Sequence, residues 1–114
     1  MPTVKIKRIY NSPAKEDGFR VLVDRLWPRG VSKEEAELDL WLKEAAPTDG
    51  LRKWFNHEAD KWVAFEKKYN EELMHNAAFG ELQQIVKKHS VVTLLYGAKD
   101  EQHNQAVVLQ KLLQ

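Results

Sequence analysis

Two short apolar runs, far apart in the sequence, limit the possible folds of this chain more than any other feature. Residues 19–23 (Phe-Arg-Val-Leu-Val) and 91–96 (Val-Val-Thr-Leu-Leu-Tyr) are almost unbroken, as in strands that are buried on both faces of a sheet. A long segment with mostly helical periodicity separates them. Such a crossover joins parallel strands with a right-handed connection. We therefore expect the two runs to be adjacent and parallel, with their carboxyl ends on one rim.

Helical spacing is clearest in the second half of the chain. Trp62, Phe65, Tyr69 and Leu73 are three, four and four residues apart, which places them on one helix face. Further helices are expected near residues 79–88 and over 101–113, the last with Asp100 as its N-cap.

The segment between the first apolar run and residue 61 predicts two more helices. Ser32 and Glu35 form a capping box, and apolar residues at helical spacing continue to Ala45, before Pro47 ends the segment. Thr48 or Asp49 would cap a short helix. Residues 3–9 alternate between apolar and charged, which is typical of an edge strand.

These patterns predict one small α/β domain over residues 1–114. It would contain a short, mostly parallel sheet of about three strands, packed with helices, and a long helical crossover between the two buried strands. A 114-residue chain with 43% hydrophobic residues is large enough to bury such a core.

Composition narrows the classes of function. The chain has no cysteine, which excludes disulfides, thiolate metal sites and cysteine nucleophiles. It has neither a basic, apolar leader nor an apolar run long enough to span a membrane. We therefore expect a cytoplasmic protein without membrane contact. The net charge of +1 lacks the strong basic excess of most nucleic-acid-binding domains.

The candidate site begins where the first apolar run ends. Asp24, Arg25, Trp27 and Arg29 follow it within six residues. Ligands of α/β proteins bind beyond the carboxyl ends of strands. Arginine presents a planar set of donors that suits carboxylate or phosphate, and tryptophan offers a flat apolar face. An ion-pair network that ties the strand to its loop is the structural alternative.

A second cluster follows the later apolar run. Lys99 and the expected helix start at Asp100 would attract an anion. His103, three residues after Asp100, could contact its carboxylate and transfer protons. The alternative is that Asp100 only caps the helix and His103 lies on the surface. A metal site of Asp24, Asp100, His103 and His57 has no supporting spacing motif, so no metal and no cofactor are predicted.

Three segments of this sequence strongly resemble the YeaO-like family, small proteins of unknown function found mainly in bacteria. They are residues 7–10 (Lys-Arg-Ile-Tyr), 18–30 (Gly-Phe-Arg-Val-Leu-Val-Asp-Arg-Leu-Trp-Pro-Arg-Gly) and 93–104 (Thr-Leu-Leu-Tyr-Gly-Ala-Lys-Asp-Glu-Gln-His-Asn). Residues 51–55 and 61–62 also match, so the resemblance covers nearly the whole chain. Glu58-Ala59 departs from the family, which often has an acid followed by proline there.

The resemblance implies a small α/β domain without an established activity. Longer relatives look distantly like rhodanese domains, with an Asp-Arg strand end and a cysteine after the later strand. Here Tyr96 and Gly97 stand near that cysteine position. Persulfide chemistry therefore does not carry over to this chain.

The leading hypothesis is a domain that binds a small anionic ligand, bearing phosphate or carboxylate, at the shared rim. Arg25, Trp27, Arg29 and Lys99 would bind the ligand, while Asp24, Asp100 and His103 would orient it or transfer protons, so an enzyme is one option. Two alternatives are kept. One is nucleic-acid binding through six basic residues: Lys5, Lys7, Arg8, Arg20, Arg25 and Arg29. The other is a protein-interaction module or homodimer.

Overall fold

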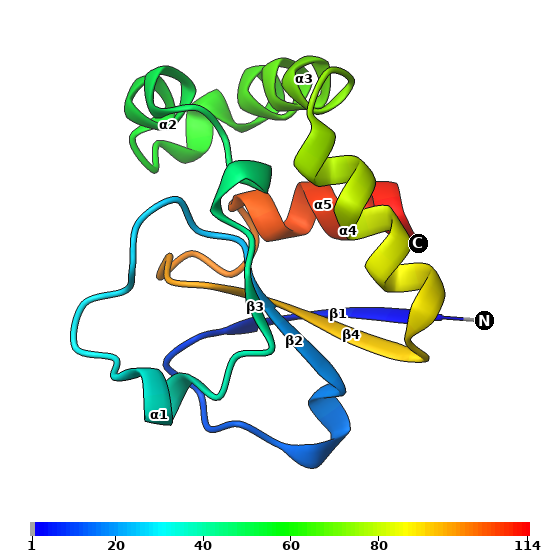
Figure 1. Cartoon of the computed structure of the whole chain (residues 1–114). Coiled ribbons are helices and arrows are strands. Elements are labelled where there is room, and N and C mark those ends of the chain that lie inside the picture. Colours follow the sequence, from blue (N-terminus) through cyan, green and yellow to red (C-terminus); the bar gives the residue numbers. More distant parts are fainter. Residues whose placement is uncertain (1) are drawn as a thin grey trace.

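The computed structural model describes residues 2–114, and in that range four strands form one parallel sheet (Figure 1). The strands are β1 (Thr3–Arg8), β2 (Phe19–Leu22), β3 (Leu40–Trp41) and β4 (Val91–Tyr96). Their spatial order is β1-β4-β2-β3, and each neighbouring pair is parallel. The predicted α/β class and the predicted pairing of the two apolar runs are confirmed, with Phe19 opposite Val92 and Leu22 opposite Leu95.

Burial explains which strands are central. β4 lies between β1 and β2, and five of its six side chains are buried. β1 is an edge strand, as its alternating lysines predict, and only Val4 is fully buried within it. Side-chain exposure to solvent therefore decreases from the edge strand β1 to the central strand β4.

The expected sheet of about three strands lacked β3, because residues 32–45 were predicted as one helix. The structure corrects this: α1 is a single turn (Lys33–Ala36), and β3 and a 3-10 turn (Lys43–Ala45) follow. The Ser32 capping box does form, but Glu37 adopts a left-handed conformation with φ of 45° and ends the helix. The helical spacing of apolar residues here is therefore incidental.

Contacts with β2 hold β3 in place. The Asp39 carboxylate accepts a hydrogen bond from the Arg20 backbone N–H at 2.8 Å. The Trp41 indole N–H donates to the Asp24 carbonyl at 2.7 Å. Leu40 packs against the main core and Trp41 against the other side of the sheet. Pairing with β2 and packing against both cores outweigh the helical preference of an isolated segment.

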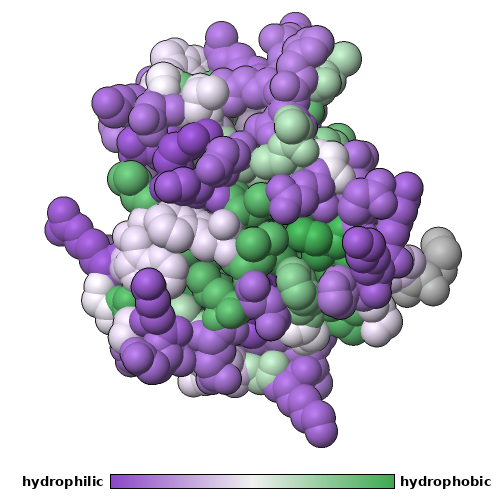
Figure 2. All heavy atoms as spheres, in the orientation of Figure 1, coloured by the Kyte–Doolittle hydropathy of each residue, from purple (hydrophilic) through white to green (hydrophobic). Residues whose placement is uncertain are grey.

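The longer helices lie together on one face of the sheet, above it in Figure 1. They are α2 (Asp49–Phe55), α3 (Trp62–Leu73), α4 (Ala77–Lys88) and α5 (Gln105–Leu113). Their apolar stripes pack with Val21, Val92 and Leu94 into the main core. Figure 2 shows polar residues over most of the outer surface on the viewed side, with apolar atoms gathered across its middle. Within residues 2–114, none of the helices has the length and apolarity to span a bilayer.

Helix α3 confirms the predicted inward face. Phe65, Tyr69 and Leu73 are buried, and Trp62 packs at the edge of the same core. The Tyr69 hydroxyl donates a hydrogen bond to the Ala45 carbonyl, which joins α3 to the segment that leads into α2. This face therefore supports the elements beside the candidate site.

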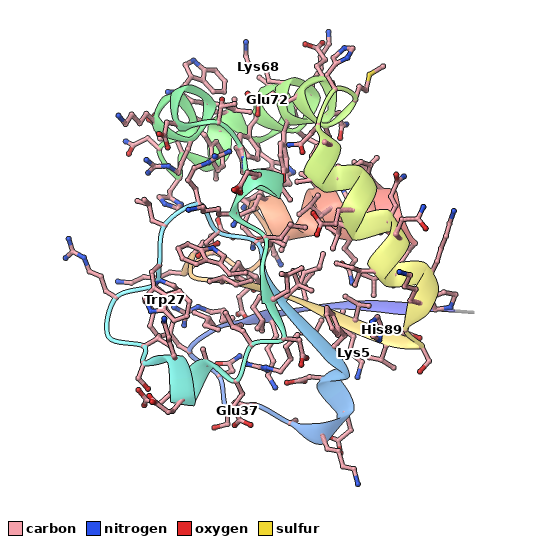
Figure 3. All side chains as sticks on the ribbon, viewed as in Figure 1. Lys5, Trp27, Glu37, Lys68, Glu72 and His89 are labelled. Atoms are coloured by element: carbon pink, nitrogen blue, oxygen red, sulfur yellow. The ribbon has the colours of Figure 1, made fainter. Side chains whose placement is uncertain are left out.

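The opposite face of the sheet has a smaller core. Ile9, Leu22, Ala36 and Leu95 form it, with Trp27 packed beside them on the loop that follows β2 (Figure 3). A buried ion pair between Arg20 and Asp17 lies at the same layer, 2.5 Å between Nη1 and Oδ2. This second layer fixes the path of the chain on either side of β2.

Candidate functional site

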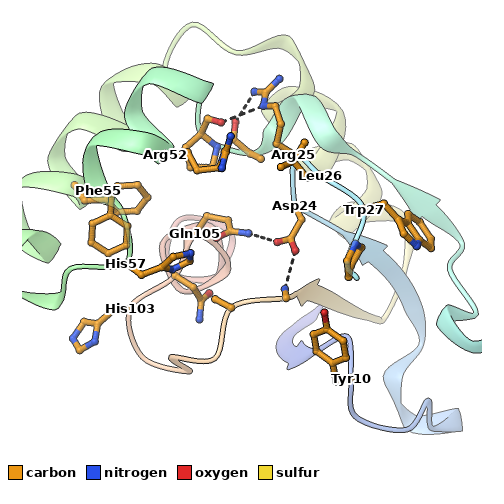
Figure 4. Close-up of a pocket in the computed structure, with 17 residues that line it drawn as sticks. Tyr10, Asp24, Arg25, Leu26, Trp27, Arg52, Phe55, His57, His103 and Gln105 are labelled. Atoms are coloured by element: carbon orange, nitrogen blue, oxygen red, sulfur yellow. Dashed lines mark hydrogen bonds between the residues drawn. The ribbon is translucent and has the colours of Figure 1, made fainter. Parts of the chain in front are cut away.

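A cavity of about 270 Å³ lies beyond the carboxyl ends of β2 and β4 (Figure 4). Residues from four parts of the chain form most of its wall: Tyr10 after β1, residues 24–28 after β2, five residues between 46 and 57 in α2 and on either side of it, and five residues between 97 and 105 after β4. The two predicted clusters thus meet on one rim, because β2 and β4 are parallel neighbours.

Asp24 is the only carboxylate among the residues that line this cavity. Its Oδ2 accepts a hydrogen bond from the Gly97 backbone N–H at 2.8 Å, and its Oδ1 accepts one from Gln105 Nε2 at 2.5 Å (Figure 4). Burial nevertheless raises the pKa of Asp24 from an ordinary value of 3.8 to about 6, although both hydrogen bonds oppose this shift. The negative charge of Asp24 is therefore incompletely compensated by its neighbours.

Gly97 allows this approach. A Cβ atom at position 97 would lie 2.9 Å from Asp24 Oδ2, closer than side-chain carbons normally come to oxygen. The carboxylate could then no longer hold its position against the backbone N–H. Asp24 thereby joins the end of β2 to the end of β4 and to the first residue of α5.

Replacing Asp24 with asparagine should remove a pH-dependent loss of stability. Folding favours the protonated acid, because the pKa of about 6 lies above the ordinary 3.8. The contribution is therefore complete below the unfolded pKa and is lost as the pH rises through about 6. This interval corresponds to roughly 2–3 kcal/mol. In urea melts, the stability of wild type relative to Asp24→Asn should fall by this amount between about pH 4 and pH 7.

An exposed acid on a 3-10 turn supplies the matched control. Asp60→Asn should run parallel to wild type over the same pH range. If the difference between wild type and Asp24→Asn is independent of pH, then the Asp24 carboxyl does not titrate with a raised pKa.

Arg25 also lines the cavity, but its guanidinium contacts backbone carbonyls and not a carboxylate. Its Nε donates to the Pro47 carbonyl at 3.2 Å and its Nη2 to the Ala46 carbonyl at 3.0 Å. Within residues 2–114, no carboxylate lies within 4.0 Å of its guanidinium nitrogens. These bonds fix the guanidinium at the wall without neutralising it, and three of its five N–H donors are left.

Arg52 and His57 line the cavity, although neither was predicted to bind the ligand. Thr48, one of the two predicted caps, begins α2, and Arg52 follows the buried Leu51 in this helix, so that its side chain lines the cavity while remaining 39% exposed. His57 follows the helix with φ of 56°. The Thr48 cap was thus the available signal for Arg52, while the conformation of His57 has no sequence signature.

Trp27 occupies both the cavity wall and the second core. Its indole N–H donates to the Val31 carbonyl at 2.7 Å, and its ring meets Trp41 edge-on with centroids 5.3 Å apart. Arg29 and Lys99 are exposed and lie outside the cavity lining. The backbone carbonyl of Arg29 accepts a hydrogen bond from the Tyr10 hydroxyl at 3.0 Å. Of the four predicted ligand-binding residues, the structure thus brings Arg25 and Trp27 to the cavity.

The expected helix start at Asp100 is corrected by the structure. Asp100 caps an isolated turn: its Oδ1 accepts from the backbone N–H groups of Gln102 and His103, and these bonds lower the pKa of Asp100. Helix α5 begins at Gln105, and Asn104 is its N-cap, accepting from Ala106 at 2.9 Å. Asn104 is buried, so its amide satisfies the helix end where a ligand had been expected.

The predicted contact between Asp100 and His103 does form, with 2.8 Å between Oδ2 and Nδ1. His103 lines the cavity and meets the Trp62 ring edge-on at 5.3 Å, whereas Asp100 lies outside the lining. Within residues 2–114, no three acidic or histidine side chains are arranged to hold a metal ion.

Comparison with known proteins identifies the family. The sequence model of a family described as the inactive DUF488-N3 subclade matches residues 3–114. The uncharacterized protein YeaO of Escherichia coli is 41% identical over 106 residues, which cover 93% of this chain and 92% of YeaO. The chain belongs to the YeaO-like family. An uncharacterized protein of Mycobacterium tuberculosis is 37% identical over 110 residues, or 96% of this chain and 92% of that protein. No solved structure matches this chain.

Position 97 of this YeaO-like chain, which has no cysteine, is a glycine that lies close to the Asp24 carboxylate. A side chain at position 97 would collide with Asp24, as the 2.9 Å distance shows. In this YeaO-like protein the Asp24 carboxylate, hydrogen-bonded to the Gly97 N–H, thus occupies the space that a side chain at position 97 would need.

Proposed function

We propose that this YeaO-like protein binds a small anionic ligand in the rim cavity, with Arg25 and Arg52 as its anion contacts. The observation that carries the proposal is the guanidinium of Arg25, which is fixed at the cavity wall by backbone carbonyls and has no carboxylate partner within residues 2–114. A fixed, unneutralised arginine attracts carboxylate or phosphate more strongly in a partly desolvated cavity than in water.

Other residues that line the cavity also favour a negatively charged ligand. Arg52 meets Asp49 at 3.4 Å, and its buried Nε has no hydrogen-bond partner. An unpaired buried donor is costly, and a ligand oxygen would satisfy it. His57 and His103 add two groups that become cationic when protonated. Asp24 is the only acid among the lining residues, while Asp49 and Asp100 contact Arg52 and His103 from outside the lining.

The dimensions of the cavity favour a small molecule. A volume of about 270 Å³ lies just below the usual range for ligand pockets, roughly 300–1,000 Å³. Phe55, Phe65 and Pro47 supply an apolar wall beside the charged groups. A ligand with one anionic group and a compact apolar part would match this lining.

A basic surface for nucleic acid has less support. Arg20, one of its six residues, is buried and paired with Asp17, and Lys7 contacts the same carboxylate at 3.1 Å. Neither side chain is available as a free phosphate contact.

Phosphate, sulfate or an organic carboxylate at millimolar concentration should raise the melting temperature of wild type by mass action. Arg25→Gln should abolish this rise, whereas Arg29→Gln, in the same loop but exposed and outside the cavity, should retain it. The measurement is a thermal melt with and without each anion. Comparing the shift rather than the melting temperature itself removes the cost of the two lost backbone contacts of Arg25. A wild type without a shift, or an equal shift in Arg25→Gln, contradicts the proposal.

A further inference from the structure

Opposite charges line the rim cavity without pairing with one another. Asp24 and Arg25 are consecutive residues, and their side chains leave the backbone in opposite directions (Figure 4). The carboxylate points to Gly97 and Gln105, and the guanidinium points to Ala46 and Pro47. Within residues 2–114 no ion pair joins Asp24 to an arginine, a lysine or a histidine. The protein thus holds a negative and a positive group apart on two walls of one cavity.

We propose that the ligand is a small zwitterion of the amino-acid type, whose carboxylate binds Arg25 and Arg52 and whose ammonium group binds Asp24. The inference rests on the proposed anion site and adds the second charge. The Asp24 carboxylate has no cationic partner, so a plain anion would place a second negative charge close to it in the small cavity. A zwitterion would instead bring a positive charge to Asp24 and a negative charge to Arg25.

The hydrogen bonding of Asp24 leaves room for such a group. A carboxylate has about four acceptor positions. Gly97 and Gln105 occupy one position on each oxygen. Both donors are neutral, so they orient the carboxylate without cancelling its charge. An ammonium group would supply the missing positive charge and a charge-assisted hydrogen bond.

The apolar wall indicates what lies between the two charges. Phe55 and Phe65 stack with centroids 4.3 Å apart, and both line the cavity. Aromatic side chains favour an apolar or aromatic group of the ligand. Phenylalanine is therefore a suitable probe. Two analogues serve as comparisons: 3-phenylpropionate lacks the ammonium group, and phenethylamine lacks the carboxylate.

The direction of proton exchange on binding distinguishes a zwitterionic ligand from an anion without an ammonium group. Titratable and charged groups reach the cavity from every element around Asp24: Arg25 beside it, Arg52 and His57 from α2 and its end, His103 before α5, and Tyr10 after β1. Burial places the pKa of Asp24 at about 6, so an ammonium group at Asp24 should lower it and release protons. An anion without an ammonium group should raise that pKa and take protons up.

Isothermal titration calorimetry of wild type with the three probes, in buffers of different ionisation enthalpy, tests the inference. Phenylalanine should bind at least about tenfold more tightly than either analogue at about pH 7, since each analogue lacks one charge-assisted contact. It should bind with proton release. Its affinity should fall about tenfold at about pH 5, where an acid with a pKa of about 6 is mostly protonated.

Variants assign the effect to one carboxylate. Asp24→Asn should bind phenylalanine and 3-phenylpropionate equally and lose the pH dependence. Asp60→Asn, an exposed acid-to-amide change, should behave like wild type. His57→Gln and His103→Gln should keep the preference for phenylalanine over 3-phenylpropionate, because this preference depends on the Asp24 carboxylate.

Each contrary result has a separate meaning. Equal or tighter binding of 3-phenylpropionate, or proton uptake with phenylalanine, overturns the zwitterion and leaves the anion site intact. Failure of phenylalanine to bind overturns it as well. Failure of 3-phenylpropionate and phosphate together, with no shift in melting temperature, removes the anion site on which the inference rests. All of these outcomes are measured on the wild-type protein. The proposal can therefore be overturned even if Asp24→Asn folds poorly.

Discussion

Replacing Phe65 with alanine should lower the free energy of unfolding by about 3–5 kcal/mol. Phe65 is 2% exposed and lies where α2 and α3 meet. Its ring stacks on Phe55 at 4.3 Å and packs against Trp62 at 5.6 Å and Tyr69 at 5.7 Å. Truncation removes the transfer free energy of the ring and leaves a void among rigid aromatic neighbours, which cannot collapse easily. Urea melts of the two proteins measure the difference.

Val63 provides the control on the same helix. Its side chain is 80% exposed, so Val63→Ala should change stability by no more than about 0.5 kcal/mol. A loss below about 2 kcal/mol for Phe65→Ala would show that α3 does not bury this face as described. Because Phe65 also lines the cavity, the void should open toward the candidate site.

The central pairing of the sheet was predictable from the sequence, because two independent constraints agree. Residues 19–23 and 91–96 are apolar enough to be buried on both faces, and the segment between them is long enough for a crossover. Chain connectivity then fixes the direction and hand of their pairing. The structure pairs Phe19 with Val92 in the expected parallel sense.

Strand β3 was not predictable in the same way. Leu38, Trp41 and Ala45 satisfy a helical period, and the Ser32 capping box starts a real turn of helix. The strand depends instead on distant partners: Leu40 pairs with Val21, and Trp41 bonds the Asp24 carbonyl. Local periodicity carries no information about such pairing, so tertiary contacts override it.

The candidate site shows the same division between local and distant information. Asp24, Arg25 and Trp27 were found because they follow a buried strand, and His103 because it can reach Asp100. Arg29 follows the same strand, but its side chain is exposed and lies outside the cavity lining. Arg52 lies in α2 and His57 just after it, and the position of this helix depends on how α2 packs against α3, which the sequence pattern does not specify.

Gly18→Ala should cost about 3–5 kcal/mol of stability, the second large effect, although it adds a single methyl group. Gly18 has φ of 65° and ψ of −131°, a backbone conformation that is almost restricted to glycine. A Cβ atom there would lie 2.4 Å from the Val91 carbonyl oxygen and 2.8 Å from Val91 Cβ. Backbone strain and a clash with the start of the central strand therefore add together, and urea melts measure their sum.

The clash cannot be relieved cheaply, because both sides of it are fixed. Asp17, next to Gly18, is paired with Arg20, and its carbonyl accepts a hydrogen bond from the Thr93 hydroxyl at 2.7 Å. Moving the loop would break these buried contacts, and moving Val91 would disturb its pairing with Thr3 in β1. Gly30→Ala separates the two causes: Gly30 has φ of 76° but open space around it, so only strain of about 1–2 kcal/mol is expected. Equal losses in the two variants would mean that the close approach to Val91 contributes nothing and that the loop moves freely against β4.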